Sequence, residues 1–571
     1  MKMIYKMKNS IKILLLFILI PFLAKSQGIL EGGSVHGNFE INSQYYNSDD
    51  KLGITDSILN GKVFGMNAFG NINYTNGNFS AGIRYEAYLP PLSGFDIRYE
   101  GHGIPFWYTS YKTKDVDITI GHFYEQFGNG LVLRSYQEWM LGSDNSFNGA
   151  RVIAHPFKGI TLKGLIGTQR YYWEPYENNN RGIVKGLDAE FFLNDVLKGL
   201  KESKTKIMIG GSFVSNYEKT RTKTIIQDTI KYEYQLPNNV AAFAGRMNIS
   251  RGKINFGTEY AYKINNPSAM NNYIYKNGEA FLANLSYSKK GLGIMLSAKR
   301  IDNMSYKSKM TELSNALDIN YLPPLSKQHK YSLATIYPYA TQPNGEMGIQ
   351  GQIMYTIPKK SKLGGKYGTK IEINYSNVHS LKKEQVSNEI GIDSTGTLGY
   401  TSGFFNIGEV NYFEDFNVMM TRKLNKSWKV KLSYINMKYN IEVVEGHVDK
   451  EDVHAHIAVA DILYKINYTN SLRFVYQQMF TEQDKGDWAA AMLEYNISPK
   501  WFFSVMDEYN YGNPEEDMKL HYYSVAFAFV KNVTRVSVSY GRQREGLLCV
   551  GGVCRQVPAS NGLSLTFSSS F

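Results

Sequence analysis

Side chains of two kinds alternate along the C-terminal stretch of the chain, from Asn561 to Phe571. One face is mainly apolar and the other carries hydroxyl groups; the first holds Leu563, Leu565, Phe567, Ser569 and Phe571, and the second Ser564, Thr566, Ser568 and Ser570. A period of two indicates a β-strand with one apolar and one wet face. A strand needs paired neighbours, so this stretch predicts a sheet, either in a membrane barrel or in a soluble β-protein.

The first patterned segment shows the same alternation. Its apolar set is Val35, Gly37, Phe39, Ile41 and Tyr45, and its polar set is His36, Asn38, Glu40, Asn42, Gln44 and Tyr46. A hairpin follows over residues 62–89, with Asn76-Gly77 in its turn, and Asn-Gly is a strong hairpin signal. On a membrane barrel the apolar set would meet lipid and the polar set would face the lumen.

Tight turns then alternate with long connections to the end of the chain. The long connections lie near residues 48–60, 90–103, 125–148, 217–238, 303–344, 379–400 and 544–560. Outer-membrane barrels have short periplasmic turns and longer extracellular loops. The sequence therefore predicts an all-β protein: one large antiparallel transmembrane β-barrel of about 24 strands, with a range of about 20 to 26.

A targeting segment precedes the barrel. Residues 1–26 combine early lysines, an apolar core from Ile13 to Leu23, and small residues at Ala24 and Ser26. This is the pattern of a signal peptide, and we expect cleavage before Gln27. No linker divides residues 27–571, which we expect to form one barrel domain in the cell outer membrane.

The composition fits a barrel with a polar lumen better than it fits a nucleic-acid-binding protein. The chain has 43 Tyr and 51 Gly, and tyrosine is common at the membrane–water interfaces of barrels. The net charge is +12, but the lysines and arginines are scattered along strands and turns without a basic helix or patch. We therefore expect anionic outer-membrane lipid, and no nucleic acid, as the partner of the excess charge.

The two cysteines, Cys549 and Cys554, bracket a short Gly-containing segment. In an exported protein such a close pair indicates a disulfide, and Gly551-Gly552 would supply the positive-φ turn that it needs. Metal binding by the two cysteines is the weaker alternative.

Charged side chains expected in the lumen are the first candidates for function. They are Arg84, Glu86, Arg134, Arg151, Asp188 and Glu190, with Lys370 and Glu372 as a further pair. Charge that faces lipid is costly, so these groups should point inward. They could form a constriction that selects solutes, or could simply be the ordinary polarity of a lumen.

The sequence does not decide the structure of three regions. Residues 130–140, 224–234 and 331–340 could each be a strand, an extension of a strand above the membrane or a loop in the lumen. The segment from Glu125 to Gly149, rich in apolar and aromatic residues, either folds inward to narrow the pore or adds two strands above the membrane. The 303–344 connection is expected to be an extracellular lid or partner surface.

Sequence patterns that would indicate catalysis or metal binding are weak. His454 and His456 follow Asp452 on one strand face, and this spacing could hold zinc, although no third ligand is evident. No GxSxG, HExxH or P-loop pattern occurs. We expect neither an enzyme nor a cofactor.

Several blocks carry a family resemblance. They are F-Y-E-Q-F-G-N-G-L-V-L-R-S-Y from Phe123, S-D-N-S-F-N-G from Ser143, Y-P-Y-A-T-Q-P-N-G-E from Tyr337, L-G-G-K-Y-G-T from Leu363 and C-V-G-G-V-C-R from Cys549. Together they resemble an uncharacterised Bacteroidetes family of exported outer-membrane β-barrel proteins, a domain of unknown function. The terminal strand likewise resembles that of outer-membrane barrels, and this implies that Phe571 is an assembly signal for the barrel-assembly machinery.

The leading functional hypothesis is a porin-like channel or transporter for polar solutes. The alternative is a plugged structural or assembly barrel whose extracellular loops dock partner surface proteins.

Overall fold

A closed antiparallel sheet of 24 strands forms the body of the protein. The computed structural model describes residues 32–59, 61–174, 181–219, 222–227 and 230–571. The first and last strands, β1 (Ser34–Tyr46) and β30 (Ser560–Ser570), pair from Asn38↔Ser570 to Tyr46↔Gly562 and so close the barrel. The predicted fold class and strand number are confirmed. The expected signal peptide, residues 1–26, lies outside the described residues.

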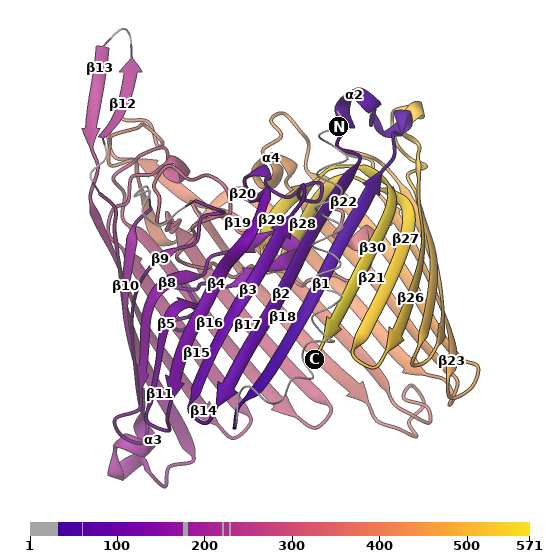
Figure 1. Ribbon diagram of the computed structural model, residues 1–571, viewed down its shortest axis with the longest axis horizontal. Helices are drawn as coiled ribbons and strands as arrows, with labels where there is room; N and C mark the ends of the chain where they lie inside the picture. Colours follow the sequence, from indigo (N-terminus) through magenta and orange to yellow (C-terminus); the bar gives the residue numbers. More distant parts are fainter. Residues whose placement is uncertain (1–31, 60, 175–180, 220–221, 228–229) are drawn as a thin grey trace.

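The strands between these two pair in chain order around the barrel (Figure 1). They are β2 (Phe64–Asn76), β3 (Phe79–Tyr88), β4 (Gly101–Lys112), β5 (Val116–Phe123), β8 (Phe147–Ala154), β9 (Ile160–Gln169), β10 (Ile183–Phe192), β11 (Thr205–Tyr217), β14 (Asn239–Arg251), β15 (Ile254–Lys263) and β16 (Gly278–Lys289). The second half consists of β17 (Leu292–Asp302), β18 (Glu346–Ile357), β19 (Thr369–Gln385), β20 (Tyr400–Lys423), β21 (Trp428–Tyr439), β22 (Val453–Lys465), β23 (Asn470–Phe480), β24 (Trp488–Ile497), β25 (Trp501–Tyr509), β26 (His521–Lys531) and β27 (Thr534–Gln543).

The two rims of the barrel differ, as the alternation of turn lengths predicts. The turn-side rim, at the bottom of Figure 1, carries the tight turns, the short helix α3 (Leu193–Val196) and the C-terminal end of β30. The loop-side rim carries the long connections, with helices α2 (Asp56–Leu59) and α4 (Ile441–Glu445). Of the three regions left open, residues 224–234 fall in the hairpin of β12 (Thr222–Gln227) and β13 (Ile230–Gln235), which stands above this rim.

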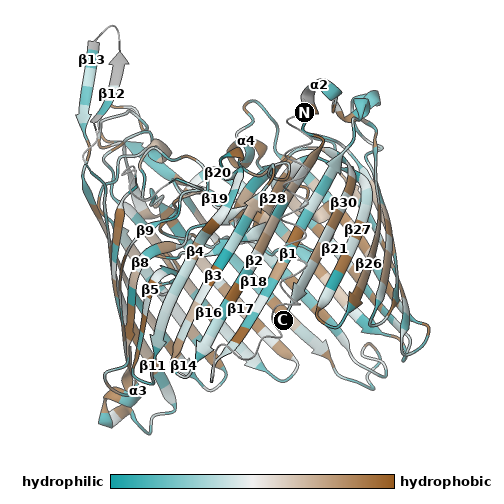
Figure 2. Ribbon diagram, in the orientation of Figure 1, coloured by the Kyte–Doolittle hydropathy of each residue, from teal (hydrophilic) through white to brown (hydrophobic). Residues whose placement is uncertain are grey.

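Hydropathy alternates along the strands, so that brown and teal residues follow one another in Figure 2. Large apolar side chains such as Ile83, Leu187, Phe243 and Leu296 are exposed on the outer face. An apolar outer face is what a lipid bilayer meets in a membrane barrel. Within the part of the chain that the structure describes, none of the helices has the length and apolarity needed to cross a membrane.

Inward side chains are buried mainly in the loop-side half of the barrel. On β11 the buried inward residues are Ser212, Val214 and Asn216, all near its loop-side end. On β14 they are Val240, Ala242, Ala244 and Arg246, again near the loop-side end. The lumen is therefore filled from the loop side, and the turn-side half is less covered.

Candidate functional site: a lumen closed by inward segments

The connection from β5 to β8, residues 124–146 and here called loop I, folds into the barrel. Its Phe127, Leu131, Val132 and Leu133 have no exposed surface. They pack on inward wall side chains that include Phe147, Leu165, Val184, Val214 and Ala242. Of the two paths considered for Glu125–Gly149, the structure has the inward one.

A polar contact fixes the tip of loop I to β15. The carboxylate Oε2 of Glu259 accepts hydrogen bonds from the backbone N and the side-chain Nδ2 of Asn129, at 2.7 and 2.8 Å. A Cβ atom on Gly128 would lie 2.5 Å from that same oxygen, and the φ of Gly128 is +52°. Glycine is therefore required at the point where the loop touches the wall.

The connection from β17 to β18, residues 303–345 and here called loop II, fills the other side of the lumen. Its Leu333, Tyr337 and Tyr339 are buried at 4% exposure or less. They pack on a large apolar surface of the wall that includes Phe413, Ile435, Tyr439, Val453, Ile457 and Trp488. The prediction of an external lid or partner surface for this connection is wrong. The inward face of β20–β24 is apolar near the loop side, and an apolar wall is stable only when it is covered.

The two loops also hold each other. Arg134 N donates to the carbonyl of Ile319 at 2.8 Å, and Tyr321 N donates to the carbonyl of Gly130 at 2.9 Å. The guanidinium of Arg134 lies 3.9 Å from the ring centre of Tyr321. Arg134, predicted as a lumen charge, therefore lies inside the plug formed by loops I and II and joins them by a cation–π contact.

A third inward segment is the hairpin of β28 (Gly546–Val550) and β29 (Val553–Val557), here called the disulfide hairpin. Cys549 and Cys554 form the predicted disulfide, and Gly551 and Gly552 turn the chain with φ of +58° and +80°. The tip touches loop II: Tyr321 Oη donates to the Gly551 carbonyl at 2.7 Å.

Further contacts of the disulfide hairpin are also hydrogen bonds. Thr341 N donates to the Gly552 carbonyl at 3.2 Å, and Arg555 Nε donates to the Met140 carbonyl of loop I at 2.7 Å. None of the residues of β28 and β29 is buried. The hairpin is thus held by polar contacts at a surface, whereas loops I and II are held by apolar packing.

Arg84 and Glu86 belong to a buried ionic group that anchors loop I. Arg84 Nε lies 2.7 Å from Glu86 Oε1, and Arg170 bonds Glu86 at 2.7 Å and Asp144 of loop I at 2.8 Å. Arg84 also contacts Asp144. The four side chains are at most 5% exposed and their charges balance, which buried ions require.

The other predicted lumen charges point inward but are also paired. Arg151 lies 3.3 Å from Asp117 and 3.3 Å from Glu125 of loop I. Asp188 and Glu190 both bind Arg246, at 2.8 and 2.9 Å. Lys370 and Glu372 pair at 2.9 Å. None of these eight sequence candidates, Arg134 included, lines the cavity of about 800 Å³ that the disulfide hairpin borders.

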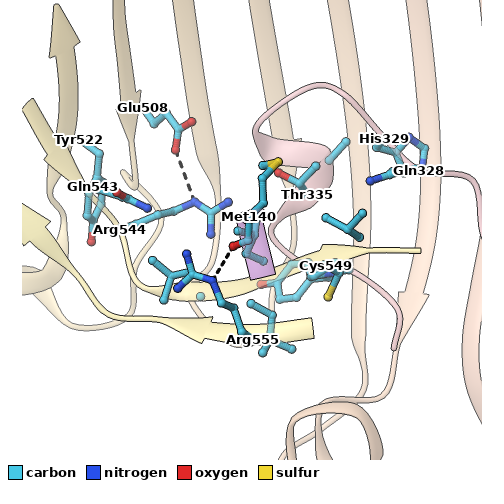
Figure 3. A pocket seen from close by; sticks show the side chains of 18 of the residues that line it. Met140, Gln328, His329, Thr335, Glu508, Tyr522, Gln543, Arg544, Cys549 and Arg555 are labelled. Carbon is cyan, nitrogen blue, oxygen red and sulfur yellow. Dashed lines mark hydrogen bonds and ion pairs between the residues drawn. The ribbon is translucent and has the colours of Figure 1, made fainter. Parts of the chain in front are cut away.

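That cavity, of about 800 Å³, lies between loop II, the disulfide hairpin and the wall (Figure 3). Its charged lining includes Glu508 of β25 and Arg544, whose Nε lies 3.5 Å from the Glu508 carboxylate. Gln328 and His329 of loop II stand opposite them. Sequence reasoning missed Glu508 and Arg544; the R-Q-R-E run at residues 542–545, next to a long connection, was the signal that could have indicated them.

The wall behind the cavity is made of small polar residues in register. Gly541 on β27 pairs with Ser524 on β26 and with Gly562 on β30. One row deeper, Ser539 pairs with Ser564, which pairs in turn with Gln44 on β1. Because most of these side chains are short, the wall of β26, β27, β30 and β1 stays away from loop II and leaves a space with both polar and apolar lining.

The underside of loop II is polar and contacts the wall through ionisable groups. Lys327 Nζ donates to Asn417 at 2.7 Å, and His329 lies 2.9 Å from Asp415. Burial lowers the pKa of Lys327, with Glu372 and Asp415 opposing this shift. Burial raises the pKa of Tyr331 to about 12, so its hydroxyl stays protonated and donates to Asp461 at 3.1 Å.

His454 and His456 lie on the outer face of β22, since Val453, Ala455 and Ile457 between and beside them face loop II. His456 Nδ1 contacts the Tyr434 hydroxyl at 2.9 Å. Asp452 pairs with Lys438 at 2.9 Å. Among the described residues, no three His, Cys, Asp or Glu side chains gather as a metal site would need.

Comparison with known proteins identifies a family but no activity. Residues 7–571 match the family described as "Family of unknown function (DUF6029)". The motif blocks had also indicated a family of unknown function, and the two results agree to that extent. None of the curated proteins matches the sequence.

Solved structures with a similar course of the chain include the siderophore receptor PirA from Pseudomonas aeruginosa, at 8% identity and a TM-score of 0.40, covering 94% of this chain and 80% of that one. The P pilus usher PapC translocation pore has 9% identity and a TM-score of 0.40, covering 94% and 99%. OccAB4 from Acinetobacter baumannii has 9% identity and a TM-score of 0.32, covering 83% and 98%. At such scores the function has to be argued from this chain's own residues.

Proposed function

The chain belongs to the family of unknown function DUF6029, so the family assigns no role. From the structure of the barrel, we propose that the protein is a gated outer-membrane channel for polar solutes. Solutes pass between the plug and the wall of β25, β26, β27, β30 and β1. The disulfide hairpin is the gate of this path.

The outer-membrane location is supported by the barrel surface and by a signal-like pattern. The outer face is apolar, as a bilayer requires. Residues 1–26 have the pattern of a secretory signal. With this location the turn-side rim faces the periplasm and the loop-side rim faces the outside.

The cavity of about 800 Å³ carries the proposal for transport. Elsewhere loops I and II pack densely against the wall through apolar side chains and through paired polar groups, such as Asp144 with Arg84 and Arg170. Along β26, β27, β30 and β1 the residues that line the cavity include serine, glycine and glutamine beside the aromatic Tyr522 and Tyr540, and the lumen is not filled there. A polar solute can be hydrated or hydrogen-bonded there and nowhere along the apolar contacts.

The disulfide hairpin suits a gate because its contacts can be exchanged for water. Each hydrogen bond to loop I or loop II contributes about 0.5–1.5 kcal/mol net, since water can replace the lost partner. The hairpin begins directly after β27 and ends directly before β30, the two strands that form the cavity wall. A swing of the hairpin would therefore open the space beside it without unfolding the plug.

The test is single-channel conductance of the refolded protein in a planar bilayer. We expect wild type to show small, intermittent currents, and a variant in which residues 546–557 are replaced by a short Gly-Ser linker to show larger, steady currents. Heat-modifiable gel mobility confirms that both are folded. A folded variant without the hairpin that carries no current would contradict the proposal.

A second candidate is a closed structural barrel that docks other surface proteins. Strand β20 is the longest of the chain, with 24 residues, and its loop-side part exposes Phe405 at 86%, Ile407 at 52% and Val410 at 47%. Exposed apolar groups at a rim are typical of a protein contact. Together with the hairpin of β12 and β13, they would form the docking surface.

This candidate is tested by gentle detergent extraction after crosslinking in intact cells. Recovery of one defined partner with wild type, and its loss after Phe405→Ser with Ile407→Ser, would favour docking. A matched control is Val533→Ser, exposed at 61% in a turn on the opposite rim. Recovery unchanged by the double substitution would argue against this surface.

A further inference from the structure

A second cavity, of about 410 Å³, lies at the turn-side mouth of the lumen and is lined by lysines from several segments. The lysines are Lys370, Lys423, Lys426, Lys429 and Lys465. They lie where β19, β20, β21 and β22 begin or end on the turn-side rim. None of the residues that line this cavity is acidic.

The register of four strands brings these lysines together. Lys423 on β20 pairs directly with Lys429 on β21, and Lys429 pairs with Leu463 on β22, two residues before Lys465. Lys370 on β19 pairs with Thr421, two residues before Lys423. Side chains two apart share a face, so all of these point into the lumen mouth. The sequence-based expectation of no basic patch is therefore wrong, because Lys370 and Lys465 join Lys423, Lys426 and Lys429 only through the strand register.

The charges of this cluster are poorly balanced. Lys370 pairs with Glu372 at 2.9 Å. Within the described residues no carboxylate forms an ion pair with the other four lysines, and Asp461, four residues before Lys465, is already shared by Lys431 and Arg473. Like charges directly opposite each other on paired strands are destabilising. A bound anion would remove this cost.

The turn between β18 and β19 forms one side of the cavity. It contains the L-G-G-K-Y-G-T block, residues 363–369, to which the proposed transport assigns no role. Gly365 and Gly368 have φ of +60° and +86°, and a Cβ atom on Gly364 would lie 1.9 Å from the Pro358 carbonyl oxygen. This turn places the ring of Tyr367 5.0 Å from Lys423 Nζ. Hydroxyl groups of Thr356, Thr421 and Ser427 line the same space.

We propose that the lysine cluster at the turn-side mouth binds a ligand through its anionic phosphate group or groups. Lysine ammonium groups act as point charges toward phosphate, and the neighbouring hydroxyls can donate hydrogen bonds to the remaining oxygens. The volume is that of a site for a small ligand. The inference goes beyond the proposed transport, because it holds whether or not the barrel conducts.

Two sources can present this chemistry. One is a soluble diphosphate compound at the mouth of the lumen. The other is a phospholipid headgroup, since Trp428, which also lines the cavity, stacks on Tyr464 with ring centres 4.4 Å apart at the same rim. Aromatic residues at a barrel rim lie at the level of lipid headgroups.

The first arm of the test is calorimetric titration of inorganic pyrophosphate into the full-length protein in a non-ionic detergent and phosphate-free buffer. We expect saturable binding that weakens about tenfold or more in Lys423→Gln with Lys429→Gln, because two of the charges are lost. Lys426→Gln, in the turn after β20, is a second variant that leaves every strand unchanged. The matched control is Lys198→Gln with Lys201→Gln, two exposed lysines of the β10–β11 connection on the same rim.

The second arm measures retention of phosphatidylglycerol, compared with phosphatidylcholine, after reconstitution in nanodiscs. Retention of phosphatidylglycerol that the double substitution abolishes assigns the site to lipid. Pyrophosphate binding without such retention assigns it to a soluble phosphate compound. If wild type and the Lys423, Lys429 double variant bind pyrophosphate equally and retain the same lipid, the proposal is wrong.

Discussion

Loop II and the disulfide hairpin both enter the same lumen, but they are held there by different forces. Loop II presents Leu333, Tyr337 and Tyr339 to an apolar wall and buries them. The hairpin stays partly exposed along its whole length and touches its neighbours by hydrogen bonds, such as that from Tyr321 to the Gly551 carbonyl.

The difference indicates which inward segment can move. Removing loop II from the wall would expose a large apolar surface to water, at about 25 cal/mol for each Å². Moving the hairpin exchanges a few hydrogen bonds with water, at a small net cost for each. We infer that loop II is a permanent part of the barrel and that the hairpin is the part that opens.

The largest effect is expected from a cavity in the core of loop II. Leu333→Ala should lower the free energy of unfolding by about 2–5 kcal/mol, because it removes a fully buried side chain. Urea unfolding in lipid vesicles measures this. Leu313→Ala, in the same loop but 66% exposed, is the control and should change stability by less than about 0.5 kcal/mol. Similar losses for both variants would show that loop II is not held by its apolar core.

The next effect concerns the disulfide. Cys549→Ser with Cys554→Ser removes a crosslink that spans five residues in sequence, and such a short loop contributes about 2 kcal/mol. Because the hairpin is partly exposed and hydrogen bonds join it to the plug, this loss should appear as faster amide exchange in residues 546–557 and as more frequent channel opening. Amide exchange in loop II should not change. Faster exchange in loop II as well would place the hairpin with loop II and remove the contrast between them.

A smaller effect is expected from one hydrogen bond. Tyr321→Phe removes the donor to the Gly551 carbonyl, which should weaken the closed hairpin by about 1 kcal/mol and raise its open fraction about fivefold. Tyr331→Phe is the matched control, since it removes the 3.1 Å bond from loop II to Asp461 and leaves the apolar packing in place. Single-channel recording should show more frequent opening than in wild type for Tyr321→Phe and no increase for Tyr331→Phe.

The smallest effect is a change in ion selectivity. Glu508→Gln neutralises the carboxylate beside Arg544 in the large cavity and leaves the arginine unbalanced. The ratio of anion to cation permeability should rise by about twofold, since one negative charge in the lining of the path is removed. Reversal potentials in a salt gradient measure it. Glu516→Gln, in an exposed rim segment, should leave the ratio unchanged; an equal shift in both variants would mean that ions do not pass beside Glu508.

Local patterns were sufficient for the barrel and for some of its details. The alternation of Leu563, Leu565 and Phe567 predicts β30, and Asn76-Gly77 predicts the turn between β2 and β3. Gly551-Gly552 predicts the tight turn that brings Cys549 and Cys554 together. Each depends on residues close together in the chain, where the backbone preference of a few side chains decides the structure.

The candidate site was harder to predict, because its parts meet only after the sheet has closed. Inward charges such as Arg84 and Asp188 were recognised, but Arg84 pairs with Glu86 and Asp144, and Asp188 pairs with Arg246, so these charges are structural. Glu508 and Arg544 were missed, since nothing near them in sequence shows that a row of serine and glycine leaves space beside them.

The sequence by itself determined that this protein is a large antiparallel barrel with short turns on one rim, long loops on the other and a disulfide in the last loop. Strand periodicity and turn chemistry act over a few residues, so they can be read along the chain. The tertiary structure decided that loops I and II enter the lumen, that a space remains beside β27 and β30, and that five lysines meet at the turn-side mouth. These features depend on strand register accumulated around the closed sheet, which brings together side chains that are far apart in sequence.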